Sequence, residues 1–189
     1  MQRSTERILD EYLVSAALIG DAEAWRRLVV RWQPRLLSHA WRLLGEADRA
    51  KDMVQEAWVE IYRGLARLND PAAFPAWALQ IVTRRCQRLF RGNARDRRLA
   101  EELEPYVNPV CAASDEHELA VDIAQMQRAL LALPAPQRAA LALFYQESLS
   151  VAEIAVALDV PPGTVKTRLM HARRKVRAFL EGDSNEQVR

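Results

Sequence analysis

The 189-residue sequence contains only two cysteines and six glycines, and it has no long uncharged apolar run. Cys86 and Cys111 do not form a CxxC motif, and no cysteine and histidine cluster has the spacing of a zinc site. These absences argue against a disulfide scaffold and a metal site, so no cofactor is expected. Cys86 is interpreted as a small buried apolar residue.

Signals for membrane insertion or export are also missing. Charged residues such as Glu6, Arg7 and Asp10 interrupt the N-terminal segment, which a signal peptide does not tolerate. No apolar run reaches the length needed to span a bilayer. We therefore expect a cytoplasmic protein without membrane contact of its own. Because the sequence also lacks a nucleotide-binding loop and a nucleophile constellation, we expect no enzyme and assign no catalytic residue.

The small net charge of +2 hides a strong separation of the two signs along the chain. Arginines are concentrated between residues 84 and 98, and basic residues recur between residues 166 and 177. Between the blocks, Arg128 is the only base from residue 99 to residue 137, where acids dominate. Two basic patches with an acidic spacer suggest two nucleic-acid contacts. The alternative is chance clustering, in which the acidic stretch neutralises a basic face.

Helical periodicity runs through most of the chain, and strand-like alternation is absent. The pattern predicts helices over residues 5–18, 21–45, 48–65, from 74 into the arginine block, 119–133 and 137–146. Asp21 fits an N-cap and Gly45 a C-cap. Pro34 is expected to kink or restart the helix that contains it. Cys86 and the five tryptophans, at helical spacing, are expected mostly to fill the core.

The helical segments group into two small domains, so the predicted fold class is all-α. The first domain spans residues 5–98 and the second spans residues 119–182. Between them, residues 99–118 read as an acidic linker, because prolines break the helical pattern there. Residues 183–189 are expected to be a disordered tail.

A helix-turn-helix pattern occupies the C-terminal part of the second domain. Ser150 and Glu153 form a capping-box pattern, and residues 159–163 then break the helix. The next helix is expected to bury Val165, Leu169, Ala172, Val176 and Phe179, and its other faces are basic. Such a unit places its second helix in a DNA major groove. A solvated cationic helix is the weaker alternative, because the only nearby acid is Glu181.

Motifs in both halves resemble those of one family. They occur in the order Asp52-Met53-Val54-Gln55-Glu56-Ala57, Phe74 to Trp77, the arginine block, Leu133-Pro134 with Arg138, and the helix-turn-helix containing Gly163-Thr164-Val165-Lys166-Thr167-Arg168-Leu169. This order is similar to that of bacterial RNA polymerase sigma factors of the extracytoplasmic-function (ECF) type, which keep sigma regions two and four. The resemblance covers nearly the whole chain.

The resemblance implies a sigma factor that binds core RNA polymerase, directs it to −35/−10 promoters and assists DNA melting. It implies docking on the β′ clamp helices through the first domain and a contact of the second domain with the β flap. Spacing alone favours a solvated face for the acidic residues of the 48–65 helix, whereas the resemblance makes them a binding surface. That surface would comprise Asp48, Asp52, Gln55 and Glu56.

The resemblance also implies two DNA surfaces and a regulatory partner. The −10 element would meet Arg67, Asn69, Asp70, Arg84, Arg85 and Arg88. The −35 element would meet Thr164, Lys166, Thr167, Arg168, Met170, His171 and Arg174. The acidic linker would thread toward the polymerase channels, and an anti-sigma factor is an expected partner.

The sequence departs from the common family pattern at two places. Many members have Arg-Asn where this chain has Thr83-Arg84, and arginine is common where His171 stands. Histidine is shorter than arginine and has fewer donors, so it cannot grip guanine in the same bidentate way. The resemblance therefore transfers no −35 sequence preference to this chain.

Two other classes of protein compete with the sigma factor. A stand-alone helix-turn-helix regulator would bind duplex DNA without polymerase, but the first domain lacks the strand–helix alternation of a receiver or ligand-binding domain. A helical adaptor that binds only proteins would leave the segregated arginines unexplained.

Overall fold

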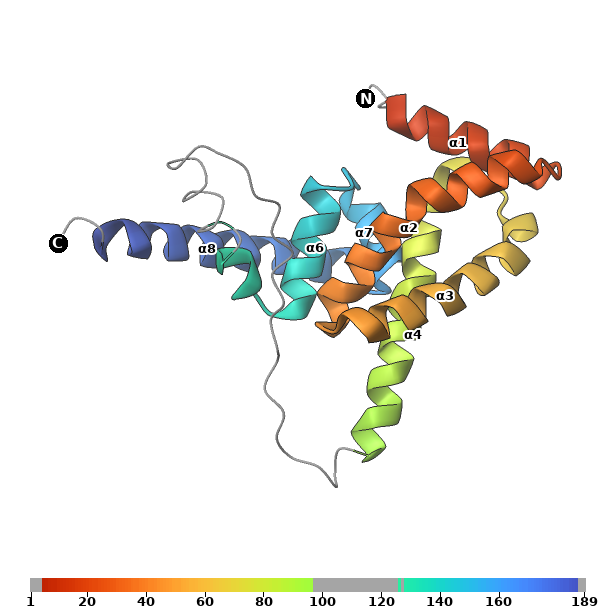
Figure 1. Cartoon of the computed structure of the whole chain (residues 1–189). Coiled ribbons are helices and arrows are strands. Elements are labelled where there is room, and N and C mark those ends of the chain that lie inside the picture. Colours follow the sequence, from red (N-terminus) through yellow and green to blue (C-terminus); the bar gives the residue numbers. More distant parts are fainter. Residues whose placement is uncertain (1–4, 97–125, 127, 187–189) are drawn as a thin grey trace, which may run out of the picture.

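The computed structural model describes residues 5–96, 126 and 128–186, and every regular element in these ranges is helical (Figure 1). The N-terminal half contains α1 (Thr5–Leu18), α2 (Ala22–Leu44), α3 (Ala47–Gly64) and α4 (Phe74–Asp96). Two short 3-10 turns, η1 (Leu65–Arg67) and η2 (Pro71–Ala73), join α3 to α4. The C-terminal half contains α6 (Ala135–Tyr145), α7 (Val151–Leu158) and α8 (Pro162–Glu186). The predicted all-α fold class is confirmed.

The predicted caps lie where the helices begin and end. The Asp21 carboxylate accepts hydrogen bonds from the backbone N–H groups of Glu23 and Ala24 at the start of α2. Gly45 adopts a left-handed conformation, with φ of 76°, and its N–H donates to the Trp41 carbonyl. These bonds satisfy backbone groups that a helix end leaves without partners.

Pro34 was expected to kink or restart its helix, and the restart does not occur, because α2 runs from Ala22 to Leu44 without interruption. Proline removes a single backbone donor, and its ring lies on the exposed side of α2. On the opposite side, Leu28, Trp32 and Leu36 are all fully buried. Packing of this apolar face on both sides of the proline therefore outweighs the missing hydrogen bond.

Other helix boundaries differ from the predicted ones by a few residues. The helix that was expected to run from residue 74 into the arginine block continues to Asp96. The helix predicted from residue 137 begins two residues earlier, at Ala135, and Pro136 lies in its first turn, where a missing N–H costs nothing. Of the predicted 119–133 helix, residues 126 and 128–131 are helical. The tail that was predicted to be disordered from residue 183 is helical as far as Glu186. The linker at 99–118, Cys111 and the last three residues of the tail lie outside the described residues.

The two halves pack directly against each other. Helix α4 lies along α7, and α2 contacts α6, so helices from both halves meet at the centre of the molecule (Figure 1). The buried side chains of both halves belong to one continuous apolar cluster, which includes Leu79 of α4 and Ile154 of α7. Sequence reasoning expected two separate domains and gave no signal for this contact.

Candidate functional site

The helix-turn-helix is held in shape by local hydrogen bonds. The Ser150 N–H donates to Glu153 Oε2 over 2.7 Å, and the Glu153 N–H donates to Ser150 Oγ over 3.3 Å, which completes the predicted capping box. Asp159 ends α7 in a left-handed conformation, with φ of 55°, and its N–H bonds to carbonyls of the last turn. Pro162 then begins α8, so residues of the turn itself set where α7 ends and where α8 begins.

Helix α8 presents one buried face and one outward face. Val165, Leu169 and Ala172 are buried as predicted, whereas Val176 and Phe179 are only half-buried. Among the predicted −35 residues, Lys166, Thr167, Met170 and Arg174 are exposed, and Thr164, Arg168 and His171 are half-buried. The Thr167 hydroxyl donates to the Gly163 carbonyl over 3.0 Å. The residues predicted to contact the −35 element therefore all lie on α8, but their side chains differ in solvent exposure.

His171 has a neighbour that sets its proton position. Arg174 Nη2 lies 3.2 Å from His171 Nδ1. Because a guanidinium only donates, Nδ1 acts as the acceptor, and the neutral ring then carries its proton on Nε2. The imidazole therefore keeps a hydrogen-bond donor at its Nε2 atom.

Arg173 is held by aromatic rings of α6, a contact that sequence reasoning missed. Its guanidinium carbon lies 5.1 Å from the Phe144 ring centroid and 5.5 Å from that of Tyr145. Stacking on two rings fixes the orientation of the charge while leaving Arg173 exposed. A fixed, exposed cation of this kind suits a backbone phosphate.

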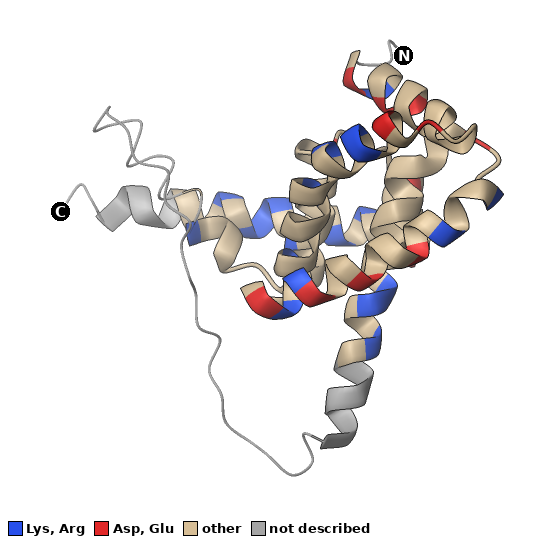
Figure 2. Cartoon of the chain, turned by 45° about the vertical axis from the view of Figure 1, so that its right-hand side comes forward, with Lys and Arg blue, Asp and Glu red and all other residues tan. Residues whose placement is uncertain are grey.

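Basic residues also gather on α4, as the blue segments on its lower part and along α8 show (Figure 2). Arg84 and Arg88 are exposed, in line with the predicted second basic surface. The guanidinium of Arg85 is instead occupied by two carboxylates of α3, Glu60 at 2.7 Å and Glu56 at 2.6 Å. The hydrogen bond to Glu60 is the main cause that raises the pKa of Arg85. The Arg85 guanidinium is thus engaged by α3, which distinguishes it from the exposed Arg84 and Arg88.

The loop between α3 and α4 carries the other predicted −10 residues. Arg67, Asn69 and Asp70 are all exposed. Asp70 also shapes the loop, because its Oδ1 accepts a hydrogen bond from the Ala72 N–H over 2.9 Å. A substitution of Asp70 would therefore change the loop as well as any contact made there.

The acidic surface of α3 is partly engaged within the chain. Asp48 has a 94% exposed side chain and pairs with Lys51 over 3.0 Å. Asp52 and Gln55 are exposed one turn further along. Glu56 shares Arg85 with Glu60, so it links α3 to α4 rather than standing free. Asp52 and Gln55 are thus the members best placed to meet another protein.

The contact between the halves reaches into the predicted −10 surface. Asp159 of the helix-turn-helix turn accepts from Gln80 Nε2 at 3.2 Å and from Arg84 Nη2 at 3.4 Å. Thr83, one of the departures from the family pattern, is buried between the halves, and its Oγ1 lies 2.6 Å from the Ala157 carbonyl. Sequence reasoning did not find these partners, because they lie far apart in the chain.

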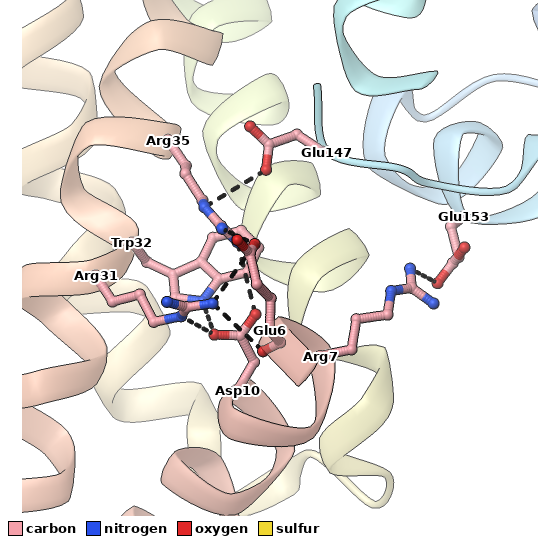
Figure 3. Close-up of polar contacts among 8 residues, drawn as sticks. All are labelled: Glu6, Arg7, Asp10, Arg31, Trp32, Arg35, Glu147 and Glu153. Carbon is pink, nitrogen blue, oxygen red and sulfur yellow. Dashed lines mark hydrogen bonds and ion pairs between the residues drawn. The ribbon is translucent and has the colours of Figure 1, made fainter. Parts of the chain in front are cut away.

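Polar side chains of α1 and α2 form a network that reaches the C-terminal half (Figure 3). The carboxylate of Asp10, which is buried, accepts from Arg31 Nε over 2.6 Å and from Trp32 Nε1 over 3.1 Å. Arg35 pairs with Glu6 over 2.7 Å and points its Nε toward Glu147 at 3.7 Å. Nearby, Arg7 and Glu153 form a 2.5 Å ion pair that joins α1 to α7.

Burial acts on the charged groups of this contact. Desolvation is the main cause that raises the pKa of Glu147, and Arg35 and Arg42 oppose it. Burial would also raise the pKa of Glu153, but its hydrogen bonds to Ser150 and its pairing with Arg7 leave that pKa lowered. Glu153 is therefore held as a carboxylate, with both a capping role and a bridging role.

The described residues also bear on metal binding, on membrane insertion and on the reactivity of Cys86. Within residues 5–96, 126 and 128–186, no three histidine, cysteine or carboxylate side chains are grouped so that they could hold a metal ion. None of the helices in the same ranges has both the length and the hydropathy for a bilayer crossing. Cys86 is buried as predicted, and burial raises the pKa of its thiol to about 12.

The sequence of this chain matches two family profiles and is similar to named proteins of other bacteria. The profile of Sigma-70 region 2 matches residues 28–96, and that of Sigma-70 region 4 matches residues 123–176. The chain is 30% identical to the RNA polymerase sigma-H factor of Pseudomonas aeruginosa and to the ECF RNA polymerase sigma-E factor of Escherichia coli. Each match covers 91% of this chain and 94% of the relative.

A solved structure shares the fold. The sigma factor RpoE from Bartonella quintana, in complex with the anti-sigma factor NepR, superposes with a TM-score of 0.67 at 21% identity. The match covers 85% of this chain and 98% of that one. At this level of identity the likeness bears on the fold alone.

Proposed function

The chain belongs to the ECF family of RNA polymerase sigma factors, and from this premise we propose how its surfaces divide the work. As a sigma factor it associates with RNA polymerase, directs it to promoters and supports transcription initiation. We propose that it works in the cytoplasm and contributes no catalytic residue to the polymerase. Its two units would be residues 5–98 and 119–182, joined by the linker.

The −35 surface is proposed to be the outward face of α8. Lys166, Met170 and His171 would meet base edges, because a recognition helix contacts bases through its N-terminal part. Met170, 57% exposed, would give an apolar contact, and the His171 Nε2–H would donate to a base acceptor. Arg173, fixed by Phe144 and Tyr145, would hold a phosphate.

The −10 surface is proposed to combine α4 with the loop before it. Arg84 and Arg88 would guide the melted strand, and Arg67, Asn69 and Asp70 would surround an extruded base. Opening DNA costs about 1.4 kcal/mol of stacking per base-pair step. Capture of an unstacked base offsets part of that cost. The observation that supports this proposal is the exposure of both arginines on a helix directly next to the loop.

The polymerase surface is proposed to be the outward face of α3, with Asp52 and Gln55 at its centre. Arg85 would then join this surface to the −10 surface, because it bonds two carboxylates of α3 from its place on α4. Polymerase docking and strand binding would thus be supported by one rigid pair of helices. Contact with an anti-sigma factor is proposed from family membership.

In vitro transcription tests the function itself. Bacterial core polymerase is incubated with fragmented DNA from the source, with and without the chain. New transcripts that start a fixed distance downstream of a shared two-part motif are expected. Tight duplex binding by the chain alone, with no new transcript, would support the stand-alone regulator instead.

Reversal of one charge tests the polymerase surface. We expect Asp52→Arg to weaken binding to core polymerase by about tenfold or more, because it places a cation in a site that favours an acid. Fluorescence anisotropy of labelled chain titrated with core polymerase measures the affinity. Glu23→Arg is the matched control, since Glu23 is an exposed acid of α2. Equal affinity for the two variants would remove Asp52 from the interface.

A further inference from the structure

His171 stands on α8 at the place where arginine is common in the family. Its ring accepts a hydrogen bond, which Arg174 Nη2 donates to Nδ1 over 3.2 Å. The two residues are three apart on one helix, so their side chains lie next to each other. A charged donor makes a stronger hydrogen bond than a neutral one, so this bond favours one tautomer of the ring.

The other ring nitrogen of His171, Nε2, carries the proton and is available. Within the described residues, Nε2 neither bonds another group of the chain nor counts among the buried polar atoms that lack a partner. It is therefore accessible to a group from outside the chain. To such a group the ring presents one donor and no acceptor.

The side chains next to His171 on the outward face cannot supply this donor. Thr167 lies one turn earlier, and its hydroxyl proton goes to the Gly163 carbonyl over 3.0 Å. Thr167 thus offers a methyl group and lone pairs. Met170 is exposed and has no donor. A preference for a hydrogen-bond acceptor at this place on α8 therefore depends on His171.

A single donor distinguishes the four bases unequally. In the major groove, guanine and adenine present acceptors at N7, thymine presents O4, and cytosine presents only its N4 amino donor. A ring with its proton on Nε2 can bond the first three bases, whereas it meets cytosine donor against donor. The other tautomer has a lone pair on Nε2, which the cytosine amino group can satisfy. The tautomer of His171 therefore decides whether cytosine is accepted.

We propose that Arg174 is a positioning residue that acts through His171: by holding the ring proton on Nε2, it makes α8 reject cytosine at the base that His171 meets. This inference rests on the proposed function of α8 as the helix that contacts the −35 element. It gives Arg174 a role other than a DNA contact of its own. The promoters that this chain recognises can then carry guanine, adenine or thymine at that base, but not cytosine.

Nitrogen NMR of the free chain tests the tautomer without DNA. Ring nitrogens with and without a proton have different chemical shifts, and His171→Gln identifies the signals of His171 among the three histidines. At about pH 8, where imidazoles are neutral, we expect the wild-type ring to carry its proton on Nε2. Arg174→Ala should populate the second tautomer, whereas Arg174→Lys, which keeps a charged donor, should restore the wild-type spectrum.

Base substitution in the −35 element tests the consequence for recognition. Holoenzyme made from core polymerase and the chain is titrated with duplexes that carry each of the four bases at each position of the upstream motif found by transcription. At one position, the wild type should bind cytosine roughly fivefold to tenfold more weakly than the other bases. In Arg174→Ala this penalty should fall to about twofold or less. Lys175→Ala is the matched control, because it removes an exposed cation from the next position of α8 and should keep the full penalty.

Three results would overturn the proposal. One is a wild-type ring without a proton on Nε2, and another is a cytosine penalty that Arg174→Ala leaves unchanged. The third is an equal loss on all duplexes in Arg174→Ala with a log–log salt slope lower by about 0.9, which would make Arg174 a phosphate contact. A holoenzyme that prefers no duplex would refute the proposed function, and the base contact with it, while the NMR signals would still report the bond between Arg174 and His171.

Discussion

His39 is a neutral imidazole because its surroundings disfavour a positive charge. The ring is fully buried in the N-terminal half, and desolvation, with a smaller contribution from Arg42, lowers its pKa to about 3. Its Nε2 bonds Thr83, while Nδ1 is buried without a partner. A second proton would therefore have to be buried uncompensated.

Acid should destabilise the chain through this residue. The imidazole of the unfolded chain takes up its proton as the pH falls below about 6.5, while the folded chain resists until about pH 3. Stability is then lost by up to about 1.4 kcal/mol per pH unit in this window, and the contribution is fully present above it. Urea unfolding at pH 7.5 and 5.0 measures the loss. The glutamine of His39→Gln cannot be protonated, so this variant should lose less unfolding free energy between pH 7.5 and pH 5.0. If it loses as much as the wild-type chain, another residue causes the effect.

Gly64 marks a close approach between α3 and α4. A Cβ atom at this position would lie 2.9 Å from Trp77 Cζ2, inside van der Waals contact. We expect Gly64→Ala to destabilise the chain by about 1–2 kcal/mol, because the indole must move within a packed site. Thermal unfolding measures the change. In the control Gly163→Ala the added methyl meets no atom within 4 Å, so an equal loss there would point to backbone effects instead.

At the scale of elements, we expect some residues of α8 to determine which promoter is preferred and others to determine how strongly DNA is bound. We expect Lys166→Ala and His171→Ala to relax promoter preference, since both lie where bases are read, and to leave polymerase binding intact. Arg173→Ala should weaken all duplexes alike and reduce the log–log salt slope by about 0.9, the value for one lost phosphate contact. Anisotropy titrations with a panel of duplexes at several salt concentrations give both quantities. An unchanged ranking of duplexes in the first two variants would contradict their assignment.

The helices and caps could be predicted because their signals are local. A cap such as Asp21 or Ser150 bonds backbone groups two or three residues away, so the sequence contains both partners side by side. The partners of Arg85 lie 25 and 29 residues away, and that of Arg84 lies 75 away, with no periodic pattern to join them. The α3 surface was therefore predicted with Glu56 free, and the fit of the two halves was not predicted at all.

Thr83 shows why a departure from a family pattern is hard to interpret from sequence. From the sequence, Thr83 and Arg84 are known only to stand where many family members have Arg-Asn. The structure gives this hydroxyl a partner in the other half of the molecule, the Ala157 carbonyl. A threonine carries no sign of a distant carbonyl, so only the packing of α4 on α7 reveals its role.

For the whole molecule, the continuous buried cluster predicts coupled unfolding of the two halves. All five tryptophans lie between residues 25 and 77, so their fluorescence reports mainly on the N-terminal half, with Trp41 also beside Arg138 of α6. Circular dichroism reports on the helices of both halves. At low salt the two melting curves should coincide, as in a two-state transition. Thr83→Val should separate them by a few degrees; curves already separate in the wild-type chain would show that the halves melt independently.

Asp159 combines two demands that favour different residues. Its backbone is in the left-handed region, where glycine is the most comfortable residue, yet its carboxylate meets Gln80 and Arg84. A change to glycine would ease the turn and at the same time remove the two hydrogen bonds that Asp159 accepts from α4. The most comfortable backbone for this turn and the strongest contact between the two halves therefore require different residues at position 159.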